Sequence, residues 1–137
     1  MTTTLTTVGT RPGLVRTLHI VYALHAVGLA LGAFGAASVV GSFLFGWPSI
    51  IAVIVSYIYR ADARGTWLES HFDWAIRTFW WALAFAAVVA LISAPLILLL
   101  GLGLVTWFIG MGLLGLWAIY RITRGWLKLN ASQPMPA

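Results

Sequence analysis

The sequence predicts an all-α membrane protein with four transmembrane helices arranged as two hairpins. Two long stretches hold no charged residue, one between Arg16 and Arg60 and the other between Arg77 and Arg121. A single helix through either stretch would be about 65 Å long at ~1.5 Å per residue. That is roughly twice the ~30 Å hydrocarbon core of a bilayer. Each stretch must therefore turn back on itself, which gives four spans.

The composition leaves no room for a separate water-soluble domain. Of the 137 residues, 61% are hydrophobic and 8% are charged, which is too little polar surface to cover a soluble core. The formal net charge of +5 does not indicate nucleic acid, because the basic residues flank the apolar stretches, where they set topology and contact lipid headgroups. Cysteine is absent, which excludes disulfides and thiolate sites. We expect one membrane domain over residues 1–137.

The boundaries of the apolar runs place the four spans. The run from Leu18 to Val40 is longer than the roughly 7–15 residues typical of a signal peptide, so we interpret it as part of the first span. Pro48 falls in the first turn of the second span, where proline suits a helix start. The second hairpin turns either at Pro95 or at Gly101–Gly103. The expected spans are about 17–40, 45–59, 76–99 and 104–120, with a cytoplasmic loop at 60–75 and a cytoplasmic tail at 121–137.

The basic residues all lie on one side of the predicted topology. The hairpin tips, around 41–48 and 93–103, hold none of them. By the positive-inside rule, both termini and the central loop then face the cytoplasm. The basic residues precede the first span, flank the central loop or follow the fourth span: Arg11, Arg16, Arg60, Arg64, Arg77, Arg121, Arg124 and Lys128.

The two uncharged stretches also have matching ends. Each is bounded by Arg-Thr and Ile-Tyr-Arg, and a later echo pairs Arg64-Gly65-Thr66-Trp67-Leu68 with Arg124-Gly125-Trp126-Leu127. Two interpretations stay open. One is a tandem duplication, with the halves as parallel repeats; the other is the usual enrichment of arginine and aromatic residues at cytoplasmic span edges.

Small residues predict two surfaces for helix packing. Gly28, Gly32 and Gly35 share one side of the first span, in the small-x-x-x-small pattern that lets helix backbones approach closely. His25 lies on the same side and is expected to face the bundle. A second surface in the fourth span consists of Gly110, Gly112 and Gly115.

The central segment predicts a helix that continues into the third span. Thr66-x-x-Glu69 has the form of a capping box, in which each side chain accepts from the amide of the other residue, so a helix should begin at Trp67. Asp73 and Arg77 are spaced for an i, i+4 ion pair. The segment forms either an aromatic belt at headgroup depth or a docking surface for a partner protein, made by Trp67, Glu69, His71, Trp74, Arg77 and Trp81.

The same segment carries a family resemblance. The motifs Arg64-Gly65-Thr66-Trp67-Leu68-Glu69-Ser70-His71-Phe72 and Ile76-Arg77-Thr78-Phe79-Trp80 resemble small bacterial four-helix membrane proteins of unknown function, which are related to the twenty-kilodalton inner-envelope component of the chloroplast protein-import machinery. Tyr22-x-x-His25, Tyr120-Arg121, Arg124-Gly125-Trp126 and Pro134-Met135-Pro136 fit the same family, whereas Asp73 and Ala75 depart from it. The resemblance implies four helices in a bacterial inner membrane and no particular activity.

The residues offer little for catalysis. Neither uncharged stretch holds the carboxylates that proton-coupled transporters use as relays, and the His-Glu-x-x-His motif of metalloproteases is absent. Glu69, His71 and Asp73 alternate along a helix, so they do not converge on a metal. The candidates for haem ligation are His25, His19 and His71, but one helix cannot aim His19 and His25 at the same iron. A hydrogen bond from neutral His25 to a neighbouring helix is the simpler interpretation.

Together these patterns predict a non-enzymatic membrane protein without a cofactor. We expect a scaffold or accessory subunit that packs against other membrane subunits or against copies of itself within the lipid bilayer, with no nucleic acid partner. An alternative is an oligomeric, import-component-like conduit or carrier, since four spans are too few to enclose a pore alone. A remote alternative is a haem-binding redox subunit.

Overall fold

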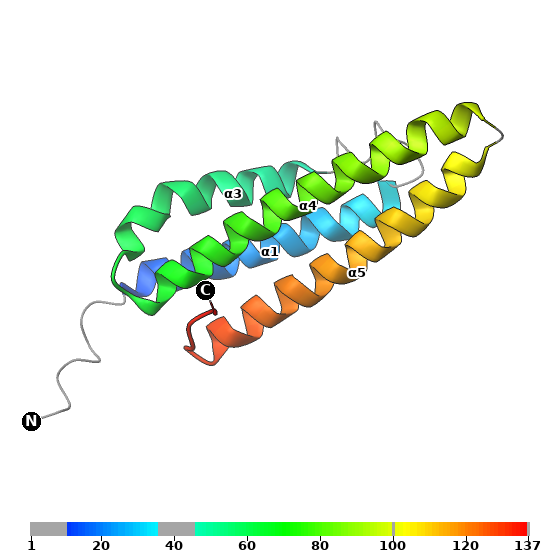
Figure 1. Ribbon diagram of the computed structural model, residues 1–137. Helices are drawn as coiled ribbons and strands as arrows, with labels where there is room; N and C mark the ends of the chain where they lie inside the picture. Colours follow the sequence, from blue (N-terminus) through cyan, green and yellow to red (C-terminus); the bar gives the residue numbers. More distant parts are fainter. Residues whose placement is uncertain (1–10, 36–45, 100, 137) are drawn as a thin grey trace, which may run out of the picture.

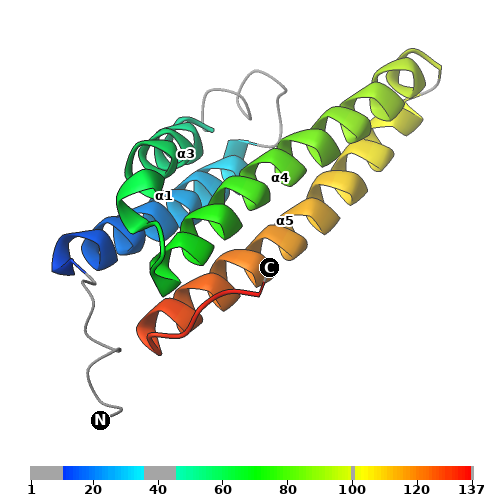
Figure 2. The same cartoon turned by 60° about the vertical axis from the view of Figure 1, so that its left-hand side comes forward.

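The computed structural model describes residues 11–35, 46–99 and 101–136, and this part of the chain is helical without strands. The all-α prediction is therefore confirmed for the described residues. Helices α4 and α5 lie side by side in opposite directions, α1 and α3 pack against them, and the α4–α5 pair extends beyond the described ends of α1 and α3 (Figure 1, Figure 2). The elements are α1 (Pro12–Gly35), α3 (Trp47–Arg60), the 3-10 helix η1 (Ala61–Ala63), α4 (Trp67–Leu98) and α5 (Leu102–Asn130).

Three of these helices are long and apolar enough to cross a membrane: Pro12–Gly32 within α1, Trp67–Leu98 and Leu102–Asn130. Helix α3 has 14 residues, which gives about 21 Å at ~1.5 Å per residue and falls short of the hydrocarbon core. A fourth span and the two-hairpin arrangement therefore stay predictions. The part of the expected first span after Gly35 lies outside the described residues.

The start of α4 agrees with the sequence prediction, but its hydrogen bonds differ. The helix begins at Trp67 and runs unbroken to Leu98. The Thr66 hydroxyl donates to the Ala63 carbonyl at 2.7 Å, and the Glu69 carboxylate accepts from the Gly65 amide at 3.1 Å. The predicted capping box is thus wrong in both bonds. Gly65 adopts a φ of +75°, which turns its own amide toward Glu69, while the Thr66 amide already bonds Ala63.

The second turn falls at the glycines and not at Pro95. Helix α4 continues through Pro95 to Leu98, and α5 begins after Gly101. Gly101 has a φ of +74°, a conformation that glycine adopts without steric cost. Two residues later, a Cβ on Gly103 would collide with the Ser93 carbonyl and the Ile97 amide. The two helices therefore approach closely at this end because a glycine stands there.

The echoing segments occupy different structures. Arg64–Trp67 spans the turn between η1 and α4, whereas Arg124–Leu127 lies inside α5. The local likeness in sequence does not extend to local conformation here.

Burial is concentrated where η1 and residues 131–136 lie, which we call the η1 end. The largest cluster of buried side chains joins α1, α4 and α5 there and includes Leu18, Tyr22, Phe72 and Leu129. Toward the opposite end the α4–α5 pair exposes its apolar side chains, with Leu91 75% and Leu98 88% exposed.

Candidate functional site

A buried histidine joins three parts of the chain at the η1 end. His71 of α4 has no exposed surface, its Nδ1 lies 2.9 Å from the Tyr22 hydroxyl of α1, and its Nε2 lies 2.7 Å from the carbonyl oxygen of Gln133. A carbonyl only accepts, so Nε2 carries the proton; in the neutral ring Nδ1 is then the acceptor and Tyr22 donates. The geometry therefore fixes the tautomer of His71.

A glycine in α5 makes room for this arrangement. A Cβ on Gly125 would lie 2.6 Å from the hydroxyl oxygen of Tyr22 and 2.6–2.7 Å from two of its ring carbons. Tyr22 therefore packs directly on the α5 backbone, and it is 1% exposed. The Trp67 indole lies against another side of His71 in an edge-to-face arrangement, with the ring centroids 5.5 Å apart.

The segment after α5 folds back along the start of α4. Met135 is 5% exposed and its amide donates to the Ser70 hydroxyl at 2.9 Å. The Arg77 guanidinium donates to the Pro136 carbonyl at 3.3 Å. Together with the bond from His71 to Gln133, these contacts attach residues 133–136 to α4.

A second polar group links α4 and α5 beside the first. The Trp74 indole donates to the Arg121 carbonyl at 3.1 Å, and Nε of Arg121 donates to the Thr78 hydroxyl at 2.8 Å. The Arg121 guanidinium lies 3.7 Å from the centroid of the Trp74 ring, a close cation–π contact. The arginine is therefore held by an aromatic face and a hydroxyl, with no carboxylate in this group.

The three histidines have separate environments. Trp126 of α5 donates its indole N–H to Nδ1 of His19 at 3.0 Å, while His71 uses both ring nitrogens as described above. His25 is 5% exposed, and its Nε2 has no hydrogen-bond partner in the described part of the chain. The expected bond from His25 to a neighbouring helix is therefore not made by Nε2. Within the same residues, no group of three His, Cys, Asp or Glu side chains could hold a metal ion.

The glycines proposed for helix packing fall into two sets. A Cβ on Gly28 would lie 2.5 Å from the Ser49 hydroxyl of α3, and one on Gly110 would lie 2.7 Å from the Val89 side chain of α4. Among the described residues, a Cβ on Gly32, Gly112 or Gly115 would meet nothing within 4 Å. The surroundings of Gly35 lie outside the described residues.

The aromatic face expected at the start of α4 points mostly into the protein. His71 and Trp74 are buried, and Trp67 is partly buried, while Trp81 stays 54% exposed. The reason is that α5 and residues 133–136 cover this face. Most of it is thus an internal contact and not a free partner surface.

The ion pair at this end also differs from the expectation. Asp73 pairs with Arg60 at the end of α3 and not with Arg77, which instead reaches Pro136. The hydrogen bond that Arg60 donates to the Asp73 carboxylate raises the pKa of the guanidinium above its ordinary value. The pair connects α3 to α4 across the η1 turn.

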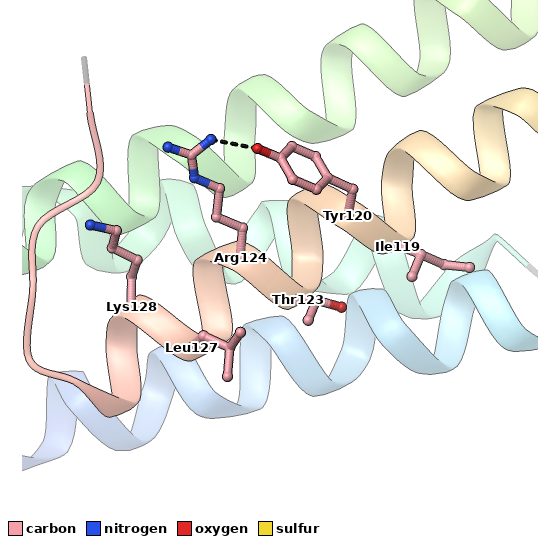
Figure 3. Close-up of a pocket in the computed structure, with 6 residues that line it drawn as sticks. All are labelled: Ile119, Tyr120, Thr123, Arg124, Leu127 and Lys128. Atoms are coloured by element: carbon pink, nitrogen blue, oxygen red, sulfur yellow. Dashed lines mark hydrogen bonds between the residues drawn. The ribbon is translucent and has the colours of Figure 1, made fainter.

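The outer surface of α5 carries a shallow groove of about 480 Å³. Figure 3 shows two rows of side chains along one helix face, with Arg124 donating to the Tyr120 hydroxyl. The first row contains two aliphatic side chains and a hydroxyl, from Ile119, Thr123 and Leu127. The second row, beside it, is polar and contains Tyr120, Arg124 and Lys128.

Sequence reasoning did not identify Tyr22, Arg121 and Gln133 as members of these polar groups. Tyr22 lies one helical turn from His25, so the sequence predicts that both lie on the side of α1 that faces the bundle. It does not predict that Tyr22 bonds His71. Comparison of the chain with protein-family models, curated proteins and solved structures found no match.

Proposed function

We propose that this chain is a non-enzymatic, four-span protein of the bacterial inner membrane, with both termini in the cytoplasm. It acts as a scaffold or accessory subunit that associates laterally with other membrane helices. The three long apolar helices and the placement of basic residues at the η1 end support insertion in this orientation. In this proposal α3 is the second of the four spans and a short one, and the expected hairpin tip between α1 and α3 lies outside the described residues.

The polar groups at the η1 end support a structural role. Tyr22, His71 and Arg121 bond to other parts of the same chain. These bonds tie α1, α4, α5 and residues 133–136 together at one end. The opposite part of the α4–α5 pair is then the part free to contact partners.

The observation that carries the proposal is an open small-residue face on α5. Gly110 packs on Val89 of α4, and Gly112 lies about 200° further round the helix at ~100° per residue, so it points away from α4. Gly112 and Gly115 both have space for a Cβ. Lipid tails are as apolar as leucine, so membrane helices associate where small residues let backbones approach.

The experiment is the association state of the full chain in mild detergent. Wild type should migrate as a complex larger than the monomer, as a homo-oligomer or with copurified membrane subunits. Gly112→Leu should shift it toward the monomer by blocking backbone approach. Leu113→Ile, at a neighbouring side chain that is 63% exposed, is the matched control and should leave the complex intact. A wild-type chain that runs only as a monomer contradicts the proposal.

A further inference from the structure

The groove on α5 has one apolar side and one basic side, as a site for an amphipathic ligand would. Its rows follow the i, i+4 spacing of the helix, so each row forms a continuous ridge. Ile119 and Leu127 are 51% and 63% exposed, with the Thr123 hydroxyl between them. The opposite ridge presents a phenol, a guanidinium and an ammonium group (Figure 3).

The two cations of the groove have only neutral partners. Arg124 donates to the Tyr120 hydroxyl, and Lys128 donates to the side-chain oxygen of Gln133 at 3.2 Å. The sequence has three acidic residues, and none of them forms an ion pair with either cation in the described part of the chain: Asp73 pairs with Arg60, Glu69 accepts from Gly65, and Asp62 lies in η1. Neither charge is therefore neutralised by a carboxylate within the described residues.

A third cation strengthens the positive field beside the groove. Arg121 and Arg124 both lie over the Trp74 ring, at 3.7 Å and 5.9 Å from its centroid. Placing like charges this close is unfavourable unless an anion compensates them. The aromatic ring offsets part of that repulsion, and the remainder favours a bound anion.

We propose that this groove binds an anionic phospholipid, with its phosphate against Arg124 and Lys128. Its glycerol lies at Thr123, and an acyl chain runs along Ile119 toward the apolar part of α5. Arginine and lysine at the edge of a span are the side chains that bind anionic headgroups. The inference rests on the proposed membrane insertion, but not on the scaffold role.

The test measures lipid retained by the full-length chain in detergent, using native mass spectrometry. The probes are phosphatidylglycerol, phosphatidylcholine and free glycerol phosphate. The main variant is R124Q/K128Q. Its control, R16Q/R64Q, removes the same charge from two exposed side chains of the η1 end. A second variant, T123E, places a carboxylate in the ridge beside the two cations while both cations stay in place. Near- and far-UV circular dichroism checks that each variant is folded.

Wild type should retain phosphatidylglycerol in preference to phosphatidylcholine. Each basic side chain that contacts the headgroup of the bound lipid contributes about fivefold in affinity, so R124Q/K128Q should weaken phosphatidylglycerol binding about 25-fold. T123E should also lose the lipid, and R16Q/R64Q should bind as wild type does. Free glycerol phosphate should not compete at millimolar concentration, because it lacks the acyl chain.

Three results would overturn the inference. One is undiminished phosphatidylglycerol retention in R124Q/K128Q or T123E. Another is an equal loss in R16Q/R64Q, which would indicate general charge attraction. The third is full competition by glycerol phosphate, which would indicate a soluble phosphate ligand. Association state is measured separately, so the scaffold proposal and the lipid site can fail independently.

Discussion

Removing one hydroxyl, by Tyr22→Phe, tests whether the buried histidine stabilises the fold. The ring stays in its place against Gly125, and only the donor to Nδ1 of His71 is lost. Since His71 has no exposed surface, water cannot replace that donor. An unsatisfied buried acceptor costs about 1–3 kcal/mol.

A second effect should reach the segment after α5. Without the Tyr22 donor, the Gln133 carbonyl is left as the one hydrogen-bond partner of the His71 ring among the described residues, and the bond from Nε2 to that carbonyl weakens because the ring has lost its second anchor. We expect faster hydrogen exchange at the amide of Met135, which bonds Ser70 in the same segment. The rest of α4 should keep its protection.

The assay is thermal unfolding in detergent, followed by tryptophan fluorescence, together with hydrogen exchange by mass spectrometry. Tyr59→Phe is the control, because Tyr59 is 39% exposed and a surface change of this kind stays within about 0.5 kcal/mol. If Tyr22→Phe unfolds at the temperature of Tyr59→Phe and the exchange at Met135 is unchanged, the hydrogen-bonded histidine does not stabilise the fold.

Three other predictions concern topology and packing. Reporter fusions after Ser42, Asp62, Leu100 and Asn130 should read outside, inside, outside and inside; an outside signal at Asp62 would end the four-span proposal. Gly28→Leu should destabilise the contact of α1 with α3 by about 1–3 kcal/mol, as overpacking does, because its Cβ would meet Ser49 at 2.5 Å. Gly32→Leu should leave the stability of the fold unchanged or raise it by up to about 1 kcal/mol, because leucine has the higher helix propensity. Both variants are measured by the same thermal unfolding. Equal effects of Gly28→Leu and Gly32→Leu would show that the α1–α3 contact is not tight.

The sequence predicted those features that depend on neighbouring residues. The start of α4 at Trp67 was predicted from the capping-box spacing of Thr66 and Glu69, although the hydrogen bonds were assigned wrongly. That error arose because the positive φ of Gly65 cannot be read from the Thr66-x-x-Glu69 spacing. The sequence left two positions open for the second turn, because proline and glycine both interrupt helices. The packing of α4 against α5 determines that the turn lies at Gly101.

The polar groups were not predictable in the same way. His71 meets partners 49 and 62 positions away in the sequence, and no periodic pattern encodes such a pairing. Asp73 illustrates the same limit: Arg77 is one turn away on its own helix, yet the η1 turn brings Arg60 closer. Gly28, Gly32 and Gly35 were interpreted as one surface; of Gly28 and Gly32, whose surroundings the structure describes, the start of α3 contacts Gly28.

The buried cluster at the η1 end has a consequence for the order in which the protein can assemble. It contains Leu18 and Tyr22 from early in the chain, and Leu129 and Met135 from more than a hundred positions later. A ribosome adds about 5–20 residues per second, so for several seconds the early side chains have no final partners. The pairs within α1–α3 and α4–α5 can form as each emerges, but the joint core closes only after residue 135 has been synthesised. Until then Tyr22 lacks its partners from α4 and α5 and stays at the surface of a partly assembled bundle.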